Sequence, residues 1–382
     1  MKPVYFDNAA TTQIREEVIE AMTENMKINY GNASSSHSFG RSSKSIVEGC
    51  RKKIATHFKA SPGEIVFTSG GTEADNLILR SAVRDLGVKH VITSKIEHHA
   101  ILHTLEQLED EYDITCSFVN LNASGQIDEQ HLNVLLEKSV HKTLVALMFV
   151  NNEIGNVLNV DPIVHLVKKH QALFHTDAVQ AIGHYALDLE KTPIDFFAAS
   201  AHKFHGPKGV GFAFVRKDSG LKPLIFGGEQ ERGFRAGTES THNIVGLSTA
   251  LDLAYENLMK EQNYIESLKS HFIQRIKMEL SEVKFNGMSE SLNESTYTLI
   301  NICLPVPEEK AAMLLFQLDL KGIACSKGSA CQSGSAKGSH VLAEILTEEE
   351  LKHPSIRFSF SIYNTIEEVD YVVNTLKELT SN

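Results

Sequence analysis

Short apolar runs alternate with amphipathic helical patterns between about residue 64 and residue 216. Apolar runs too short for helices predict buried strands, and the helical periodicity after most of them predicts helices packed on a sheet. Strands that are apolar on both faces are typical of a mostly parallel sheet that helices cover on both sides. The expected strands are residues 64–68, 90–93, 144–150, 173–176 and 212–215, and the expected helices include 74–84 and 163–170.

The pattern changes between residues 243 and 280, where apolar residues recur at helical spacing. The polar run 260–263 interrupts this pattern, so we expect two helices with a domain junction near that run. Two further strands are expected at 297–302 and 355–360, in a smaller α/β domain. The sequence is therefore interpreted as a large domain over residues 15–259 and a small domain that combines residues 1–14 and 260–382.

Composition and charge narrow the possible functions. Hydrophobic residues make up 42% of the chain and charged residues 22%, as in ordinary folded proteins. The 37 Lys and Arg against 48 Asp and Glu leave a net charge of −11, which argues against general nucleic-acid binding and against docking on anionic membranes. The longest apolar run, Leu144 to Val150, is too short to span a membrane, and we expect no signal peptide. Five cysteines, an odd number, favour a reducing cytoplasm over a disulfide framework.

Candidate chemistry follows the strands, because ligands of open α/β sheets bind at the carboxyl ends of the strands. Gly70, Gly71 and Thr72 follow the first apolar run and open a helix, which predicts a phosphate cradle or, alternatively, an ordinary capped turn. His98 follows the second run and could stack on an aromatic ligand, shuttle a proton or simply lie at the surface. Asp177 directly follows a buried strand, where its partner would be a protonated pyridine nitrogen or a neighbouring Arg or Lys.

Lys203 is the most informative of these candidates. It follows an apolar run and precedes the Gly- and Pro-rich segment 206–209, so we expect its amine in the interior, with a lowered pKa, where it is usable for a Schiff base. Ser200 and His202 beside it could bind a phosphate, and Asn152 offers an amide at another strand end. A phosphate cradle, a ring acid and a lysine at successive strand ends are what a pyridoxal phosphate enzyme needs.

A segment rich in Gly, Ser and Ala, residues 325–339, carries a further candidate. Cys331 in this segment is flanked by lysines and expected to be exposed, which favours the thiolate and makes it a candidate nucleophile. The other four cysteines, Cys50, Cys116, Cys303 and Cys325, lie on helix- or strand-like segments and are expected to be inert.

Taken together, these motifs resemble the cysteine desulfurases of the NifS/IscS type, which belong to the class V aminotransferase family of fold type I pyridoxal phosphate enzymes. The resemblance covers nearly the whole chain and rests on residues 5–12, 68–73, 150–155, 202–203, 206–209, 235–238, 328–331 and 355–359. It implies a large domain with a mostly parallel, seven-stranded-type sheet, a smaller C-terminal α/β domain and a homodimer. Residues 361–364 depart from the family, which usually has Gly-Arg-Phe/Tyr there.

The resemblance also implies roles around a bound pyridoxal 5'-phosphate. Lys203 would hold the cofactor covalently and move protons, and His98 would stack on its ring and act in proton transfer. Asp177 would pair with the ring nitrogen and Gln180 with the ring hydroxyl. The implied phosphate-binding residues are Gly71, Thr72, Ser200 and His202, joined by Thr238 from the dimer partner.

For the substrate, L-cysteine, the resemblance implies that Arg357 and Asn32 hold the carboxylate, with Asn152 beside cofactor and substrate. The Cys331 thiolate would attack the substrate sulfur, leave an enzyme persulfide and release alanine. The persulfide would pass to a sulfur acceptor, such as an iron–sulfur scaffold protein or an enzyme of thio-cofactor synthesis.

Three alternatives stay open. The chain could be a selenocysteine lyase or another pyridoxal phosphate-dependent β-eliminating lyase. It could be a metal-dependent hydrolase that uses His98, His99, His103, His202 and His205, although His99 and His103 lack an obvious third ligand and we expect no metal site. It could also be a non-catalytic homologue that acts only as a binding partner.

Overall fold

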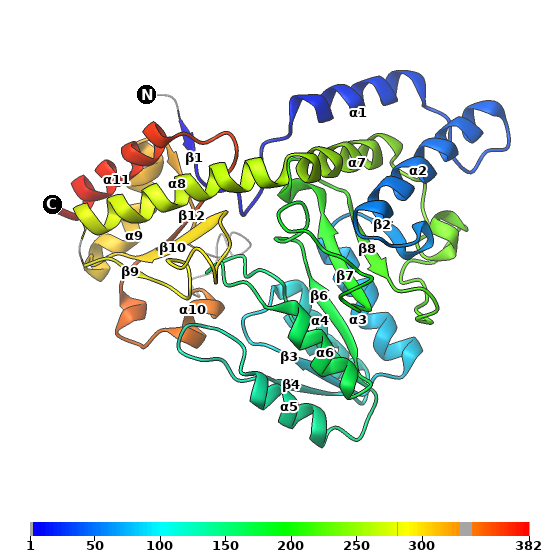
Figure 1. Ribbon diagram of the computed structural model, residues 1–382, viewed down its shortest axis with the longest axis horizontal. Helices are drawn as coiled ribbons and strands as arrows, with labels where there is room; N and C mark the ends of the chain where they lie inside the picture. Colours follow the sequence, from blue (N-terminus) through cyan, green and yellow to red (C-terminus); the bar gives the residue numbers. More distant parts are fainter. Residues whose placement is uncertain (1–2, 281, 328–337, 382) are drawn as a thin grey trace.

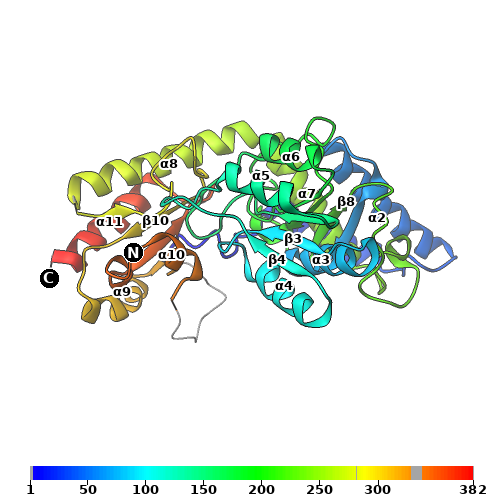
Figure 2. The same ribbon diagram turned by 90° about the horizontal axis from the view of Figure 1, so that it is seen from below.

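The computed structural model of the chain describes residues 3–280, 282–327 and 338–381. It consists of two lobes, and both chain ends lie in the smaller one (Figure 1). The long helix α8 (Leu258–Glu279) runs from the larger lobe along the smaller one, as both Figure 1 and Figure 2 show. Within the described residues, no helix is both long enough and apolar enough to cross a membrane.

A seven-stranded sheet in the order β2-β8-β7-β6-β5-β3-β4 forms the centre of the larger lobe. Its strands β3 to β7 pair in parallel, whereas β8 is antiparallel to both β2 and β7. The strands are β2 (Ile65–Thr68), β3 (His90–Thr93), β4 (Thr115–Phe118), β5 (Thr143–Ala146), β6 (Leu173–Asp177), β7 (Phe196–Ser200) and β8 (Gly211–Val215). The predicted α/β class with a mostly parallel seven-stranded sheet is confirmed.

Helices cover both faces of this sheet because its strands are apolar on both sides. On β7, Phe196 and Ala198 pack in the cluster that includes α3 and α4, while Phe197 and Ala199 pack in the cluster on the opposite face. The first face is covered by α3 (Gly71–Leu86) and α4 (His99–Glu111). The second cluster includes α1 (Glu16–Ile28), α2 (Ser38–His57), α5 (Glu129–Lys138), α6 (Val160–Lys169) and α7 (Thr241–Glu256).

The smaller lobe has its own sheets and core. Strands β12, β10 and β9 form an antiparallel sheet, and β1 pairs with β11 in parallel. Phe6 from the N-terminal segment packs at edge-to-face angles against Phe358 and Phe360, so the two chain ends share one core. The elements are β1 (Val4–Tyr5), β9 (Lys284–Phe285), β10 (Leu299–Cys303), α9 (Glu308–Leu320), β11 (Ile323–Ala324), α10 (His340–Ile345), β12 (Ser355–Ser359) and α11 (Ile366–Ser381). The division at residues 14 and 259 remains a prediction.

The predicted element boundaries need correction at two places, and the expected strands did not include β4 and β7 of the central sheet. The break between α7 and α8 falls at Asn257, and the polar run 260–263 lies inside α8, where Glu261 accepts hydrogen bonds from Arg15. The strand expected over 144–150 ends as β5 at Ala146. Strand β4 was missed because it is a partly exposed edge strand without an apolar run.

Candidate active site

A cavity of about 220 Å³ lies where the parallel strands β3, β5, β6 and β7 end. Ten of the predicted residues line it together, although they come from segments up to 286 positions apart (357 − 71). The smaller lobe contributes Arg357 and His340, so both lobes form its walls. The predicted lining residues are Gly71, Thr72, His98, Asn152, Asp177, Gln180, Ser200, His202, Lys203 and Arg357.

One end of the cavity is built to take an anion. Helix α3 begins there at Gly71 and no side chain caps its first turn, so backbone N–H groups remain for a ligand. A Cβ on Gly71 would lie 2.4 Å from Val179 Cγ2, which explains why this position has no side chain. Thr72 and Ser200 supply hydroxyl groups at the same wall. Burial lowers the pKa of His202 to about 4, so its imidazole is neutral at pH 7 and can donate a hydrogen bond. These groups fit a phosphate.

Asp177 carries a buried carboxylate, which a positively charged ligand group would stabilise. Its Oδ1 accepts a hydrogen bond from the Val179 N–H at 2.9 Å. Within the described part of the chain, no Lys, Arg or His forms an ion pair with Asp177. Burial raises the pKa of Asp177 even though His98 and Lys203 interact with it electrostatically in the opposite direction, so its negative charge remains costly there. A protonated ring nitrogen would supply a positively charged partner, so this acid fits the pyridine end of pyridoxal phosphate.

Lys203 occupies the short 3-10 helix Ala201–Lys203 that follows β7. The sequence predicted that Lys203 would be enclosed in the interior, but the residue is half-buried at the cavity wall. Its Nζ donates hydrogen bonds to the carbonyl of Ala9 at 2.6 Å and to that of Ala10 at 2.8 Å. The Gln180 amide also donates to Ala9 O, at 2.9 Å. The N-terminal segment thus holds two of the predicted cofactor-binding side chains.

His98 caps the start of α4, and its Nδ1 accepts a hydrogen bond from the Ala100 N–H at 3.1 Å. Burial lowers the pKa of His98, which favours the neutral imidazole with its proton on Nε2. A neutral ring can stack on an aromatic cofactor and take or give a proton. Near it, the ring of His99 lies 4.5 Å from that of His103 and 4.4 Å from that of His340. In the described ranges, no group of three or more His, Cys, Asp or Glu could hold a metal ion.

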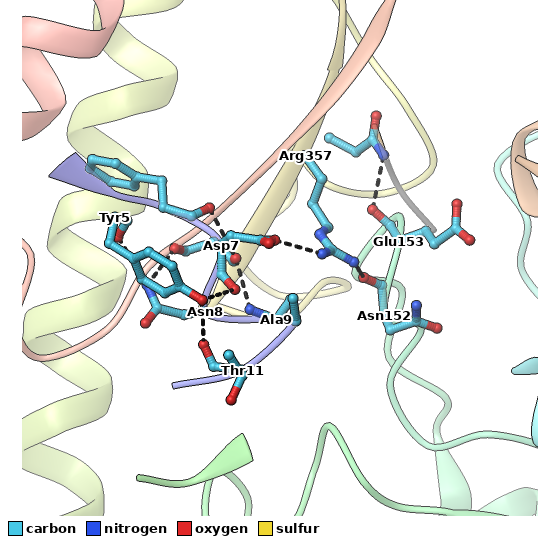
Figure 3. Close-up of polar contacts among 12 residues, drawn as sticks. Tyr5, Asp7, Asn8, Ala9, Thr11, Asn152, Glu153 and Arg357 are labelled. Atoms are coloured by element: carbon cyan, nitrogen blue, oxygen red, sulfur yellow. Dashed lines mark hydrogen bonds and ion pairs between the residues drawn. The ribbon is translucent and has the colours of Figure 1, made fainter. Parts of the chain in front are cut away.

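Arg357 closes the cavity from the smaller lobe. Its side chain is only 2% exposed, and it donates from Nη1 to the carbonyl of Asn152 at 2.7 Å and from Nη2 to Asp7 Oδ1 at 2.9 Å (Figure 3). The backbone of Arg357 also exchanges two hydrogen bonds with Ser326. A fixed guanidinium can hold a substrate carboxylate by paired hydrogen bonds.

Three predicted residues are not among the described residues that line the cavity. Asn32 is exposed, and its Oδ1 accepts a hydrogen bond from the Ser34 N–H. Thr238, which was expected to act on the partner's site, is also exposed. Cys331 lies outside the described residues. The roles of all three remain predictions.

The chain on both sides of residues 328–337 contacts the cavity walls. Ser326 pairs with Arg357, as described above. On the other side, Ser339 Oγ donates to Glu153 Oε2 at 2.5 Å, and His340 Nε2 lies 2.9 Å from the carbonyl oxygen of Glu97. Burial raises the pKa of all four described thiols, to about 12 for two of them, so none is a thiolate at pH 7. These are Cys50, Cys116, Cys303 and Cys325.

Sequence reasoning missed a buried pair behind Asp177. Asp75, on α3, lines the cavity, and its Oδ1 lies 3.0 Å from His175 Nε2. Both side chains are at most 1% exposed. His175 lies two residues before Asp177 on β6, so strand alternation places both on one face, and this spacing could have revealed it.

Comparison with known proteins identifies the family. The family model described as aminotransferase class-V matches residues 4–372. The chain belongs to the class-V aminotransferase family. Among curated members, it is 42% identical over 389 residues to "Putative cysteine desulfurase IscS 1" of Bacillus subtilis (strain 168), covering 100% of both chains. It is 39% identical over 383 residues to "Cysteine desulfurase IscS" of Dictyoglomus turgidum, covering 99% of this chain and 94% of the relative.

Solved structures agree with this class-V assignment. A "NIFS-LIKE PROTEIN" superimposes with a TM-score of 0.90 at 34% identity, covering 99% of each chain. A structure titled "SspA in complex with cysteine" has a TM-score of 0.79 at 32% identity, covering 94% of this chain and 99% of the other. The predicted family, fold class and enzyme class are confirmed, with pyridoxal phosphate as the cofactor. This family assignment contradicts the alternative that the chain is a metal-dependent hydrolase.

Proposed function

We propose that this class-V enzyme takes sulfur from L-cysteine, releases L-alanine and holds the sulfur as a persulfide on Cys331. One observation supports this most: a single cavity combines an uncapped helix N-terminus, the buried acid Asp177, the amine of Lys203 and the guanidinium of Arg357. Bound pyridoxal phosphate supplies an electron sink for bonds at the substrate's α-carbon. The relatives named cysteine desulfurase, at about 40% identity over the full chain, point to the same reaction.

The residues at the phosphate and ring ends would hold the cofactor. Thr72, Ser200 and His202 would bind the phosphate together with the N–H groups that start α3, with Thr238 of a second protomer completing the site. Asp177 would hold a proton at the ring nitrogen. The proposed ring contacts are the flat face of His98 and the amide of Gln180.

At the substrate end, we assign the carboxylate to Arg357, with Asn152 and Asn32 nearby. Lys203 and His98 would move protons at the α-carbon of the substrate and at the carbon that loses the sulfur, since both side chains line the cavity. The Cys331 thiolate would then form a bond to the substrate sulfur as the carbon–sulfur bond breaks. The electron pair of the broken bond stays with the carbon, and protonation of that carbon gives alanine.

Exposed apolar side chains support the proposed homodimer. Helix α1, the segment after it and the first turn of α2 expose Met26, Ile28, Tyr30 and Phe39 by half or more of their surface. Phe226 is 74% exposed and lies in the segment that leads to Thr238. An apolar patch of this kind is typical of a surface that another chain covers. We propose that the dimer forms through this surface and that Thr238 contacts the partner's cavity.

The persulfide would be delivered to a protein acceptor, for iron–sulfur cluster or thio-cofactor synthesis, and a cytoplasmic location would keep the Cys331 thiol reduced. A comparison of two cysteine variants tests the proposed reaction. With L-cysteine and a reductant, we expect the wild type and Cys325→Ala to release sulfide at similar rates. Cys331→Ala should keep the visible absorption of the bound cofactor and lose sulfide release. Undiminished sulfide release from Cys331→Ala would refute the proposal.

A further inference from the structure

The N-terminal turn 7–10 connects the two ends of the proposed substrate site. We propose that Asp7 in this turn is a positioning residue, whose carboxylate orients Arg357 to receive the carboxylate of an α-amino acid. This inference rests on the proposed function and extends it to a residue for which the sequence suggested no role. The contacts of Arg357 with Asp7 and Asn152 are drawn in Figure 3.

Asp7 and the carbonyl of Asn152 hold the Arg357 guanidinium from two sides. Nη2 donates to Asp7 Oδ1 at 2.9 Å, and Nη1 donates to Asn152 O at 2.7 Å. Nε of Arg357 is buried and has no hydrogen-bond partner among the residues that the structure describes. Since a guanidinium carries five N–H groups, the two fixed nitrogens leave donors for a ligand while setting the plane of the fork.

Hydrogen bonds within the turn and to the C-terminal part of the smaller lobe hold the turn in place. The N–H groups of Ala10 and Thr11 both donate to the Asp7 carbonyl, at 3.0 and 3.3 Å. The Asn8 amide donates to the Ser359 carbonyl at 2.8 Å and to Asn364 Oδ1 at 3.2 Å. The segment in which the sequence departs from the family pattern therefore buttresses this turn through Asn364.

The same turn also contacts the amine that is proposed to hold the cofactor and to move protons. Lys203 Nζ donates to the carbonyls of Ala9 and Ala10, only two and three residues after Asp7. One short stretch of backbone thus sets the position of Arg357 relative to Lys203. An α-amino acid carries its carboxylate and its amine on one carbon, and a ligand of this class would place the carboxylate at Arg357 and the amine on the Lys203 side of the same cavity.

Loss of the Asp7 carboxylate would release Arg357 toward a competing acid. Glu153 follows Asn152 and interacts electrostatically with Arg357. With Asp7 removed, Arg357 would be a buried cation without its carboxylate partner, and Glu153 would attract it away from the ligand position. The expected result is weaker binding of ligands that carry a carboxylate, with no effect on ligands that lack one.

The test uses the holoenzyme and two ligands that carry no sulfur to transfer, L-alanine and L-alaninamide, titrated by the change in cofactor absorption. Asp7→Ala should weaken L-alanine binding about tenfold or more, because charge-assisted hydrogen bonds are strong, and leave L-alaninamide binding unchanged. Asp7→Asn keeps an oxygen that can accept a hydrogen bond from Arg357 Nη2. The L-alanine affinity of this variant should therefore lie between those of the wild type and Asp7→Ala. Asp188→Asn, which removes a carboxylate from a surface ion pair with Lys59, is the matched control and should leave both affinities unchanged.

Three results would overturn the inference: unchanged L-alanine affinity in Asp7→Ala, tighter L-alanine binding, or an equal loss for both ligands. The last result would indicate a general structural role for Asp7. Turnover of L-cysteine by the wild type is measured in parallel. A wild type that converts L-cysteine while Asp7→Ala binds L-alanine normally refutes only the role of Asp7, whereas a wild type that leaves L-cysteine unchanged refutes the proposed function.

Discussion

The buried ion pair between Arg51 and Glu231 should contribute strongly to stability. Arg51, on α2, donates to both carboxylate oxygens of Glu231, at 2.6 and 2.8 Å, and each side chain is 3% exposed. Glu231 Oε2 also accepts the N–H of Phe67 on β2 at 2.8 Å. Glu231 and Arg232 both have positive φ angles, 49° and 56°, so these contacts hold a strained backbone that leads toward Thr238.

Glu231→Gln leaves Arg51 buried without its main counter-charge. Removal of one partner from a buried ion pair costs roughly 3–5 kcal/mol. Glu48, whose carboxylate lies 3.1 Å from Arg51 Nε, is 39% exposed and stays as a second counter-charge. We therefore expect the free energy of unfolding to fall by an amount at the lower end of this range, about 3 kcal/mol.

The assay is urea unfolding followed by two independent probes, applied as a double-mutant cycle of Glu231→Gln, Arg51→Met and the double variant. The coupling energy of the pair should exceed about 1.5 kcal/mol. Glu111→Gln, which breaks a surface pair with Arg80, serves as the control and should cost less than about 1 kcal/mol. A loss below 1 kcal/mol for Glu231→Gln, with no coupling, would refute the reasoning.

Three further predictions concern single side chains. Lys203→Ala should retain no cofactor after borohydride reduction and denaturation, as judged by mass spectrometry, whereas the wild type should; retention by the variant would contradict the role of Lys203. Asp177→Asn should bind pyridoxal phosphate about tenfold or more weakly in titrations of the cofactor-free protein, because a charged hydrogen bond is lost, and equal affinity would count against Asp177 as the ring partner. Burial lowers the pKa of Lys269 to about 7. The unfolded chain then binds more protons between about pH 7 and 10, so the free energy of unfolding should rise with pH there, by up to about 5 kcal/mol. Lys269→Met should flatten this rise. An equal rise of the free energy of unfolding with pH in the wild type and the variant would contradict the prediction.

Much of the sheet could be predicted from local pattern. The runs that became β2, β3 and β6 are short, apolar and followed by polar residues, so their ends were near the true ones. Strand β4 gave no such signal, because its residues are partly exposed at the sheet edge. The helix break at Asn257 gave no such signal either, because the polar run 260–263 lies inside α8 and does not mark its start.

Some residues of the candidate site could likewise be predicted from local pattern, and others could not. Asp177, Ser200 and Lys203 lie at or just after strand ends, so their positions along the sequence revealed them. Asp7 could not be found in this way, because its partner Arg357 is 350 residues distant and the pairing depends on how the two chain ends fold together. Pairings across such separations are set by tertiary structure, which local sequence patterns do not encode.

The central claim is that L-cysteine is converted to L-alanine with its sulfur left on Cys331. The most direct measurement incubates the holoenzyme with L-cysteine without reductant, quantifies the small products and locates added sulfur by peptide mass spectrometry. The account predicts alanine and added sulfur in equal amounts, with the sulfur on the peptide that contains Cys331. Pyruvate and ammonia in place of alanine, or no sulfur on that peptide, would contradict it.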